Sequence, residues 1–257
     1  MSSKKDKKKT NERFLEDYLY TSDKARMLTL VSEMTESAKS LLVKSLKALE
    51  ERDLHLAQQV AEEDDKIDIL EEKIDQECLY SIASRQPLRE NLRYVYGIMK
   101  IITDLERIGD QSVNLSRQLH SYAENCGLDE PLPKLDEMKI IGQKCVAMAD
   151  IFLAALKDED EGILNFMDKK HDEVLVIYLN ASTLLLHSLS LHYPEENHIG
   201  VYISLEILRH LRRVADHFLN LAERVYFIAT GISPLTLKKK RWPKGLSEIV
   251  LKSWSDD

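Results

Sequence analysis

Acidic side chains recur in pairs at three places in the sequence, and the members of each pair are four residues apart. Positions i and i+4 of a helix share one face, so the two carboxylates of a pair repel each other by about 0.2–0.5 kcal/mol. A hard divalent or trivalent cation, which prefers oxygen ligands, would remove that repulsion. The pairs are therefore candidate metal ligands: Asp64 with Asp68, Glu106 with Asp110, and Asp168 with Asp172.

A single acidic pair has a simpler explanation, because exposed carboxylates are commonly solvated or balanced by a neighbouring cation such as Arg107. Repetition makes these pairs informative. The run DLERIGDQSVNLS at 104–116 returns 106 residues later as HLRRVADHFLNLA, and the pair at 64 and 68 returns at 168 and 172. Gly109 and Ala215 stand at one equivalent position of the two runs, where a small residue lets another helix approach closely. The sequence therefore predicts an internal duplication.

The elements that carry these pairs are expected to be long helices. The chain has only 8 Gly and 6 Pro in 257 residues, and the prolines stand where the helical periodicity stops. Helices of 30 residues extend for roughly 45 Å and pack side by side in bundles. We expect six of them, at about 12–51, 53–84, 88–124, 134–157, 160–190 and 195–230.

The predicted fold is all-α, with two tandem three-helix bundles of long antiparallel helices that arise from the duplication. The repeats are expected at 27–126 and 134–232. Residues 1–26 are expected to form a basic N-terminal extension with the start of the first helix, and residues 233–257 a basic C-terminal tail. An apolar stripe on the third helix should face the core, formed by Ile98, Ile101, Leu105, Ile108, Ser112, Leu115 and Leu119.

Composition and charge exclude several classes of function. The net charge of −8 gives the body of the chain a negative field that repels nucleic acid, and the Gly-rich phosphate loops GxxxxGK[ST] and GxGxxG are absent from the sequence. No apolar run reaches the length of a membrane span and the N-terminus lacks the apolar segment of a signal peptide, so we expect a cytoplasmic protein. Cys78, Cys126 and Cys145 form no CxxC pair and are expected to be core or helix-surface thiols.

The C-terminal tail combines cations with aromatic side chains in the runs KKKRWPK and GLSEIVLKSW. Such a segment could contact anionic lipid or the groove of a partner protein. The alternatives are a solvated tail and packing against the protein's own bundle. The residues concerned are Lys238, Lys239, Lys240, Arg241, Trp242 and Trp254.

Three longer runs, EDDKIDILEEKID, SRQPLRENLRYVYGIMKIITDLERIGDQSVNLS and LRRVADHFLNLAERVYFIATG, resemble the PhoU family of phosphate-transport regulators over residues 27–232. The resemblance implies an all-helical protein that restrains phosphate uptake and phosphate-starvation signalling. It also implies multinuclear clusters of iron, zinc, manganese or magnesium on E(D)xxxD motifs. The implied partners are a membrane phosphate transporter and, in many members, a sensor histidine kinase. We further expect a homodimer that reaches the inner face of the membrane through these partners.

The family's metal motif is met in the first half by Asp64 and Asp68 and by Glu106 and Asp110. In the second half Asp168 and Asp172 match. Arg212 replaces the glutamate of the last motif, so that only Asp216 remains there. A cation at that position repels metal and could pair with Asp216, so we expect the first half to hold metal more tightly than the second.

The alternative function is that of a carboxylate-bridged metal oxidase, or a metal-storage protein, in a helical bundle. Such sites take a Glu-x-x-His motif from each of two helices. The sequence offers Glu195 with His198 and, as an aspartate variant, Asp168 with His171, and these occurrences are unpaired. We therefore expect a regulatory protein that is not an enzyme.

Overall fold

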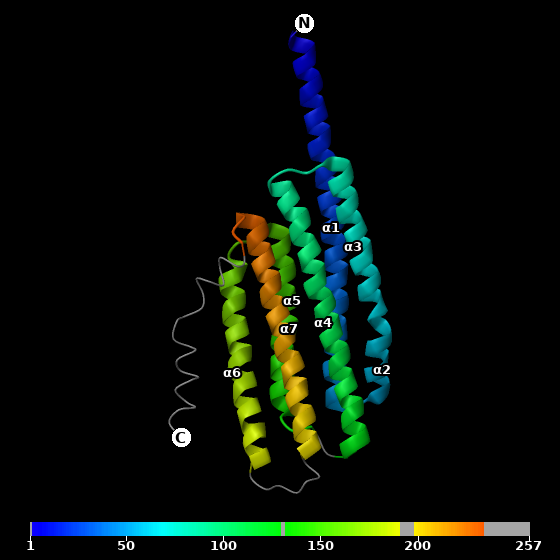
Figure 1. Ribbon diagram of the computed structural model, residues 1–257, viewed down its shortest axis with the longest axis vertical. Coiled ribbons are helices and arrows are strands. Elements are labelled where there is room, and N and C mark those ends of the chain that lie inside the picture. Colours follow the sequence, from blue (N-terminus) through cyan, green and yellow to red (C-terminus); the bar gives the residue numbers. More distant parts are fainter. Residues whose placement is uncertain (1, 130–131, 191–197, 234–257) are drawn as a thin grey trace.

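The computed structural model describes residues 2–129, 132–190 and 198–233, with the backbone alone described for residues 2–20 and 190. These residues form an all-helical protein (Figure 1). Pro87 follows the end of one helix and Pro133 precedes the start of another, close to the expected positions, and the first helix begins ten residues earlier than predicted. The helices are α1 (Ser2–Glu51), α2 (Leu54–Glu63), α3 (Asp65–Arg85), α4 (Glu90–Cys126), α5 (Leu135–Asp158), α6 (Ile163–Ser190) and α7 (His198–Thr230).

Two three-helix units lie side by side, as the duplication predicts. The first contains α1, the pair α2 and α3, and α4, and the second contains α5, α6 and α7. Figure 1 shows α2 and α3 following one direction and the chain reversing at the other connections between helices, and the N-terminal part of α1 projects beyond the other helices. None of the described helices is long and apolar enough to cross a membrane.

The second helix of the first unit is interrupted, whereas the sequence predicts one helix over 53–84. Asp53 caps the start of α2, where its side chain accepts a hydrogen bond from the backbone N–H of Leu56 at 3.0 Å. The interruption falls at Asp64, whose carbonyl accepts from the N–H groups of Ile67 at 2.7 Å and Asp68 at 3.4 Å. The backbone of Asp64 stays in the right-handed helical region, so α3 continues in nearly the same direction. A predicted metal ligand therefore lies at the junction of α2 and α3.

The core lies between the helices of each unit and continues between the units. The predicted stripe on α4 is confirmed, because all of its members are buried: Ile98, Ile101, Leu105, Ile108, Ser112, Leu115 and Leu119. Cys78 and Cys145 are buried thiols and Cys126 is an exposed one. These thiols therefore lie in the core and on the helix surface, as expected.

The two units meet along α4 and α7, and also along α1 and α5. In the first of these contacts Asp104 accepts hydrogen bonds from His217 at 3.0 Å and from Asn220 at 3.1 Å. Further along, His210 Nδ1 lies 2.9 Å from Gln111 Oε1. Positions 104 and 210 are equivalent in the duplication, and so are 111 and 217. The two polar contacts are therefore related by the pseudo-twofold symmetry that the antiparallel pairing of α4 with α7 creates.

Candidate metal centre

Gly109 brings the two predicted motifs of the first unit together. This glycine is buried on α4, and a Cβ atom built on it would lie 2.8 Å from Asp64 Oδ1 and 2.7 Å from Ile67 Cδ1. The carboxylate of Asp64 therefore lies directly against the backbone of α4, within the turn that carries Glu106 and Asp110. Close helix packing is thus the reason why a glycine occupies this position.

The carboxylates on α3 and α4 raise one another's pKa. Partial burial, followed by the charges of Asp68 and Asp110, raises the pKa of Asp64 to about 6. Partial burial, followed by the charge of Asp110 and with smaller contributions from Glu71 and Asp68, raises the pKa of Glu106 to about 6. The structure therefore brings the two first-half motifs into one negatively charged site whose repulsion is only partly relieved.

Glu71 is a member of this site that the sequence analysis did not identify. It lies one turn beyond Asp68 on α3, and burial together with the charges of Asp75, Asp68 and Asp110 raises its pKa. Its position three residues after Asp68, on the same face of the helix, was the feature of the sequence that could have identified it. The search for repeated pairs missed it because the equivalent position in the second unit is Leu175.

Arg107 supplies part of the counter-charge, as the simpler explanation of the acidic pairs requires. Its Nε lies 3.3 Å from Glu106 Oε2 and its Nη1 lies 3.1 Å from Asp110 Oδ2. The Arg107 side chain is 53% exposed, and exposed ion pairs of this kind contribute roughly 0–1 kcal/mol. An external cation could therefore displace it at small cost.

The donor set of the first unit fits a hard cation, because it consists of carboxylate oxygens whose charges are incompletely neutralised. Among the described residues, no three His, Cys, Asp or Glu side chains form a group already arranged around a metal position. Coordination would therefore require rotation of the carboxylate side chains at the contact of α3 with α4. Metal binding by this site stays a prediction.

The second unit neutralises its carboxylate internally. Asp216 Oδ1 lies 2.8 Å from His171 Nε2, and Asp216 Oδ2 lies 3.0 Å from Arg212 Nη1. The guanidinium of Arg212 also lies over the ring of Tyr178, 5.5 Å from its centroid. The ion pair of Arg212 with Asp216 that the sequence suggested is therefore present, and His171 completes it from α6.

The other two predicted ligands of the second unit lie on α6. Asp172 is exposed and Asp168 is partly buried. Leu175 and Leu179 occupy the positions equivalent to Glu71 and Asp75, so the acidic stripe of α3 does not continue on α6. The second unit thus has fewer oxygen donors near its motif and two cationic or potentially cationic groups among them.

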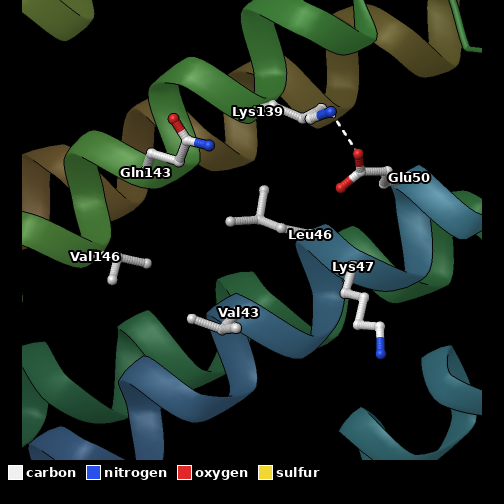
Figure 2. A pocket seen from close by; sticks show the side chains of 7 residues that line it. All are labelled: Val43, Leu46, Lys47, Glu50, Lys139, Gln143 and Val146. Atoms are coloured by element: carbon white, nitrogen blue, oxygen red, sulfur yellow. Dashed lines mark hydrogen bonds and ion pairs between the residues drawn. The ribbon is translucent and has the colours of Figure 1, made fainter.

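A different kind of hollow lies between α1 and α5 (Figure 2). It has a volume of about 310 Å³ and is lined by apolar side chains, including those of Val43, Leu46 and Val146. One ion pair crosses it, between Lys139 Nζ and Glu50 Oε1 at 2.5 Å. Because Glu50 is the one carboxylate that lines it and is paired with Lys139, this hollow offers no set of oxygen donors comparable to that on α3 and α4.

Both units of the chain match one known protein family. The sequence model of the PhoU domain matches residues 31–119 and matches residues 138–225 a second time. The chain belongs to the PhoU family. The two matches lie within the predicted repeats, whose outer limits stay predictions.

PhoU relatives with curated names cover most of the chain. A "Phosphate-specific transport system accessory protein PhoU homolog 1" of Thermotoga maritima is 33% identical over 216 residues, which are 83% of this chain and 87% of that protein. A PhoU homolog of Rhizobium meliloti is 30% identical over 211 residues, or 79% and 84% of the two chains. The crystal structure of PhoU from Pseudomonas aeruginosa matches with a TM-score of 0.76 at 28% identity, covering 83% of this chain and 100% of that one.

The two PhoU domain matches contain all seven predicted ligands. Those of the first unit come together at the contact of α3 with α4, and Asp216 of the second unit contacts Arg212 and His171. The predicted partner or membrane contacts Lys238, Lys239, Lys240, Arg241, Trp242 and Trp254 lie outside the described residues. They also lie outside both PhoU domain matches.

Proposed function

We propose that this protein regulates phosphate transport, as an accessory protein that binds a membrane phosphate transporter from the cytoplasmic side and restrains its activity. The observation that carries the proposal is the PhoU domain match in both units. It is supported by relatives of the phosphate-specific transport system that align over 84% and 87% of their own length. The sensor histidine kinase is a proposed second partner, and a homodimer the proposed assembly.

The fold supports a binding role. Its long helices present an extended surface, and the polar contacts of Asp104 with His217 and of Gln111 with His210 join the two units along α4 and α7. Because the described residues contain no helix able to cross a membrane, we assign the association with the membrane to the transporter that the protein binds.

The first unit is the proposed metal-binding unit. Asp64, Asp68, Glu106 and Asp110, with Glu71 beside them, would hold one or more divalent or trivalent ions of iron, zinc, manganese or magnesium. Such an ion supplies positive charge that neutralises the carboxylates between α3 and α4. Bound metal would therefore stabilise the contact of these two helices.

The second unit is proposed to need less metal or none. Arg212 and His171 already face Asp216, where both occupy the space of a metal and Arg212 supplies the positive charge that a metal would otherwise provide. The oxidase alternative would use His171 of the Asp168–His171 motif as a metal ligand. Because His171 Nε2 is engaged by Asp216, this contact counts against the alternative. We therefore retain the regulatory function.

Affinity capture from membranes tests the proposed function. The full chain with an affinity tag is expressed in cells grown with abundant phosphate, membranes are dissolved in mild detergent, and retained proteins are identified by mass spectrometry. A phosphate transporter should be retained, and deletion of the gene for this protein should increase phosphate uptake. Retention of no phosphate transporter together with unchanged uptake would refute the proposal.

A variant at the proposed metal site tests whether binding of the transporter depends on metal. Glu106→Gln is compared with the matched variant Arg212→Gln, which introduces the same side chain at the equivalent position of the second unit. If metal shapes the docking surface, capture of the transporter should weaken with Glu106→Gln and persist with Arg212→Gln. Equal capture of the transporter by both variants would mean that binding of the transporter does not depend on the metal site.

A further inference from the structure

A groove lies where α5 ends and α6 begins. It has a volume of about 460 Å³, and its floor is apolar, with Ile151 and Ala154 from α5 and Ile163 and Phe166 from α6. Phe166 is 50% exposed, a large fraction for an aromatic side chain. Lys170 Nζ of the same helix lies over one face of this ring, 5.7 Å from its centroid.

The rim of this groove is negatively charged. Asp158 and Asp160 line it, and Glu161 beside them is exposed. Glu159, the fourth carboxylate of the connection, forms an ion pair with Lys24 of α1. Exposed Lys157 offsets part of the charge, which leaves a net negative rim around an apolar floor. An occupant that matches both features carries cations next to a large apolar side chain.

The chain's own C-terminal segment has this composition. Residues 238–244 read KKKRWPK, with four consecutive cations followed by Trp242. The described chain stops at Ser233, just beyond α7, and Figure 1 shows the end of α7 at the same end of the bundle as the end of α5 and the start of α6. Both α5 and α6 pack against α7.

The length of the intervening chain suits this groove. Trp242 is nine residues beyond Ser233, which corresponds to a reach of about 30 Å when extended. Packed helices have axes about 8–10 Å apart, so the groove on α5 and α6 is within this reach from the end of α7.

We propose that residues 238–244 dock on the groove at the α5–α6 junction of the same molecule, with Trp242 against Phe166 and the preceding cations beside Asp158, Asp160 and Glu161. The docked segment buries its indole and neutralises its charge against the rim. Docking therefore competes with any contact that the same cations make with an anionic membrane surface. The C-terminal tail becomes an internal ligand of the second unit.

The tryptophans of the chain provide a direct test, because the sequence has only two and both lie in the tail, at 242 and 254. Trp254→Phe makes the fluorescence of the full-length protein a signal of Trp242 alone. We expect a blue-shifted emission that resists quenching by iodide, that does not change on dilution, and that shifts toward the red in concentrated salt, which screens the charged rim.

Charge reversal at the rim should release the segment. Asp158→Lys with Asp160→Lys, in the Trp254→Phe background, should shift the emission to that of solvated indole and restore iodide quenching. Phe166→Ser, which leaves the rim charges in place, should do the same through loss of the apolar floor. The control Asp129→Lys with Asp136→Lys makes the same change of charge at the other end of α5 and should leave the emission unchanged.

Three outcomes would overturn the proposal. Solvated emission from the Trp254→Phe protein that the rim variants do not alter would mean that the segment is free in solution. A blue shift that disappears on dilution would mean that it binds a second copy of the chain. A blue shift that develops only with vesicles containing phosphatidylglycerol, equally in the rim variants, would mean that it binds anionic lipid.

Discussion

Replacement of Glu106 by glutamine should stabilise the metal-free protein. The raised pKa of Glu106, about 6 against 4.5, means that the folded protein binds this proton more tightly than the unfolded chain does. The ionised side chain therefore opposes folding at neutral pH, by about 2 kcal/mol for a shift of this size. The substitution also removes the exposed contact of Glu106 with Arg107, which reduces the stabilisation by about 0–1 kcal/mol. We expect a net gain of about 1 kcal/mol, or roughly 2–4 °C in the midpoint of thermal unfolding.

The same replacement should abolish stabilisation by metal. A metal at a concentration one hundred times its dissociation constant stabilises a folded protein by about 2.7 kcal/mol, which corresponds to roughly 5–10 °C for a chain of this size. Thermal unfolding with increasing Mn²⁺ should show such a shift for the parent protein. Glu106→Gln should show little of it, because the site loses a charged ligand from α4.

Arg212→Gln is the matched control for both effects. It removes the ion pair with Asp216 and the contact with Tyr178, so the metal-free protein should lose up to about 1 kcal/mol while its response to Mn²⁺ persists. Elemental analysis of the dialysed proteins measures the metal content independently. The reasoning fails if Glu106→Gln destabilises the metal-free protein, or if the metal content of the two variants is the same.

Two further substitutions test the contact of α4 with α7 and the packing of α4 against Asp64. His210, which contacts Gln111, has its pKa lowered to about 4, chiefly by burial, so its own contribution to the free energy of unfolding should fall by about 2 kcal/mol as the pH falls from above 6.5 to 5, against the opposite contribution of Asp64 and Glu106, whose pKa values are raised. His210→Gln should reduce this loss in urea unfolding at the two pH values, and an unchanged pH dependence would contradict the assignment. Gly109→Ala gains about 1 kcal/mol of helix propensity but places Cβ 2.8 Å from Asp64 Oδ1 and 2.7 Å from Ile67 Cδ1, an overpacking that costs about 1–3 kcal/mol. We expect a net loss of stability and weaker binding of Mn²⁺, and a more stable variant with unchanged binding would refute the packing argument.

The helices could be predicted from the sequence because burial on one face leaves a periodic record. The stripe on α4 from Ile98 to Leu119 is buried throughout, and prolines cannot continue a helix. The interruption at Asp64 left no such record. No proline or glycine marks it, and the backbone of Asp64 is itself helical, so the change is confined to the hydrogen-bond pattern.

The site could be predicted in part, because the duplication allowed one half to be compared with the other. Asp64, Asp68, Glu106 and Asp110 have the recurring spacing, and the structure brings them together. His171 was missed as a partner of Asp216, because the equivalent residue of the first unit is an isoleucine. Contacts between helices depend on how each helix is rotated, and residue spacing within one helix does not determine that rotation.

The α4–α7 contact explains how the duplicated units could keep one geometry while their chemistry differs. Equivalent positions hold Asp104 and His210, and the residues opposite them are His217 and Gln111, so a contact that contains a carboxylate and a contact between an imidazole and an amide occupy symmetric places. Either pair satisfies the polar groups at the interface, and the backbone arrangement persists. The motif positions differ in the same way, since Arg107 neutralises only part of the carboxylate charge of the first unit, whereas Arg212 pairs with Asp216 in the second. If the first unit binds metal as proposed, the metal would act on the contact of α3 with α4, and α4 is also the helix that packs against α7 of the second unit.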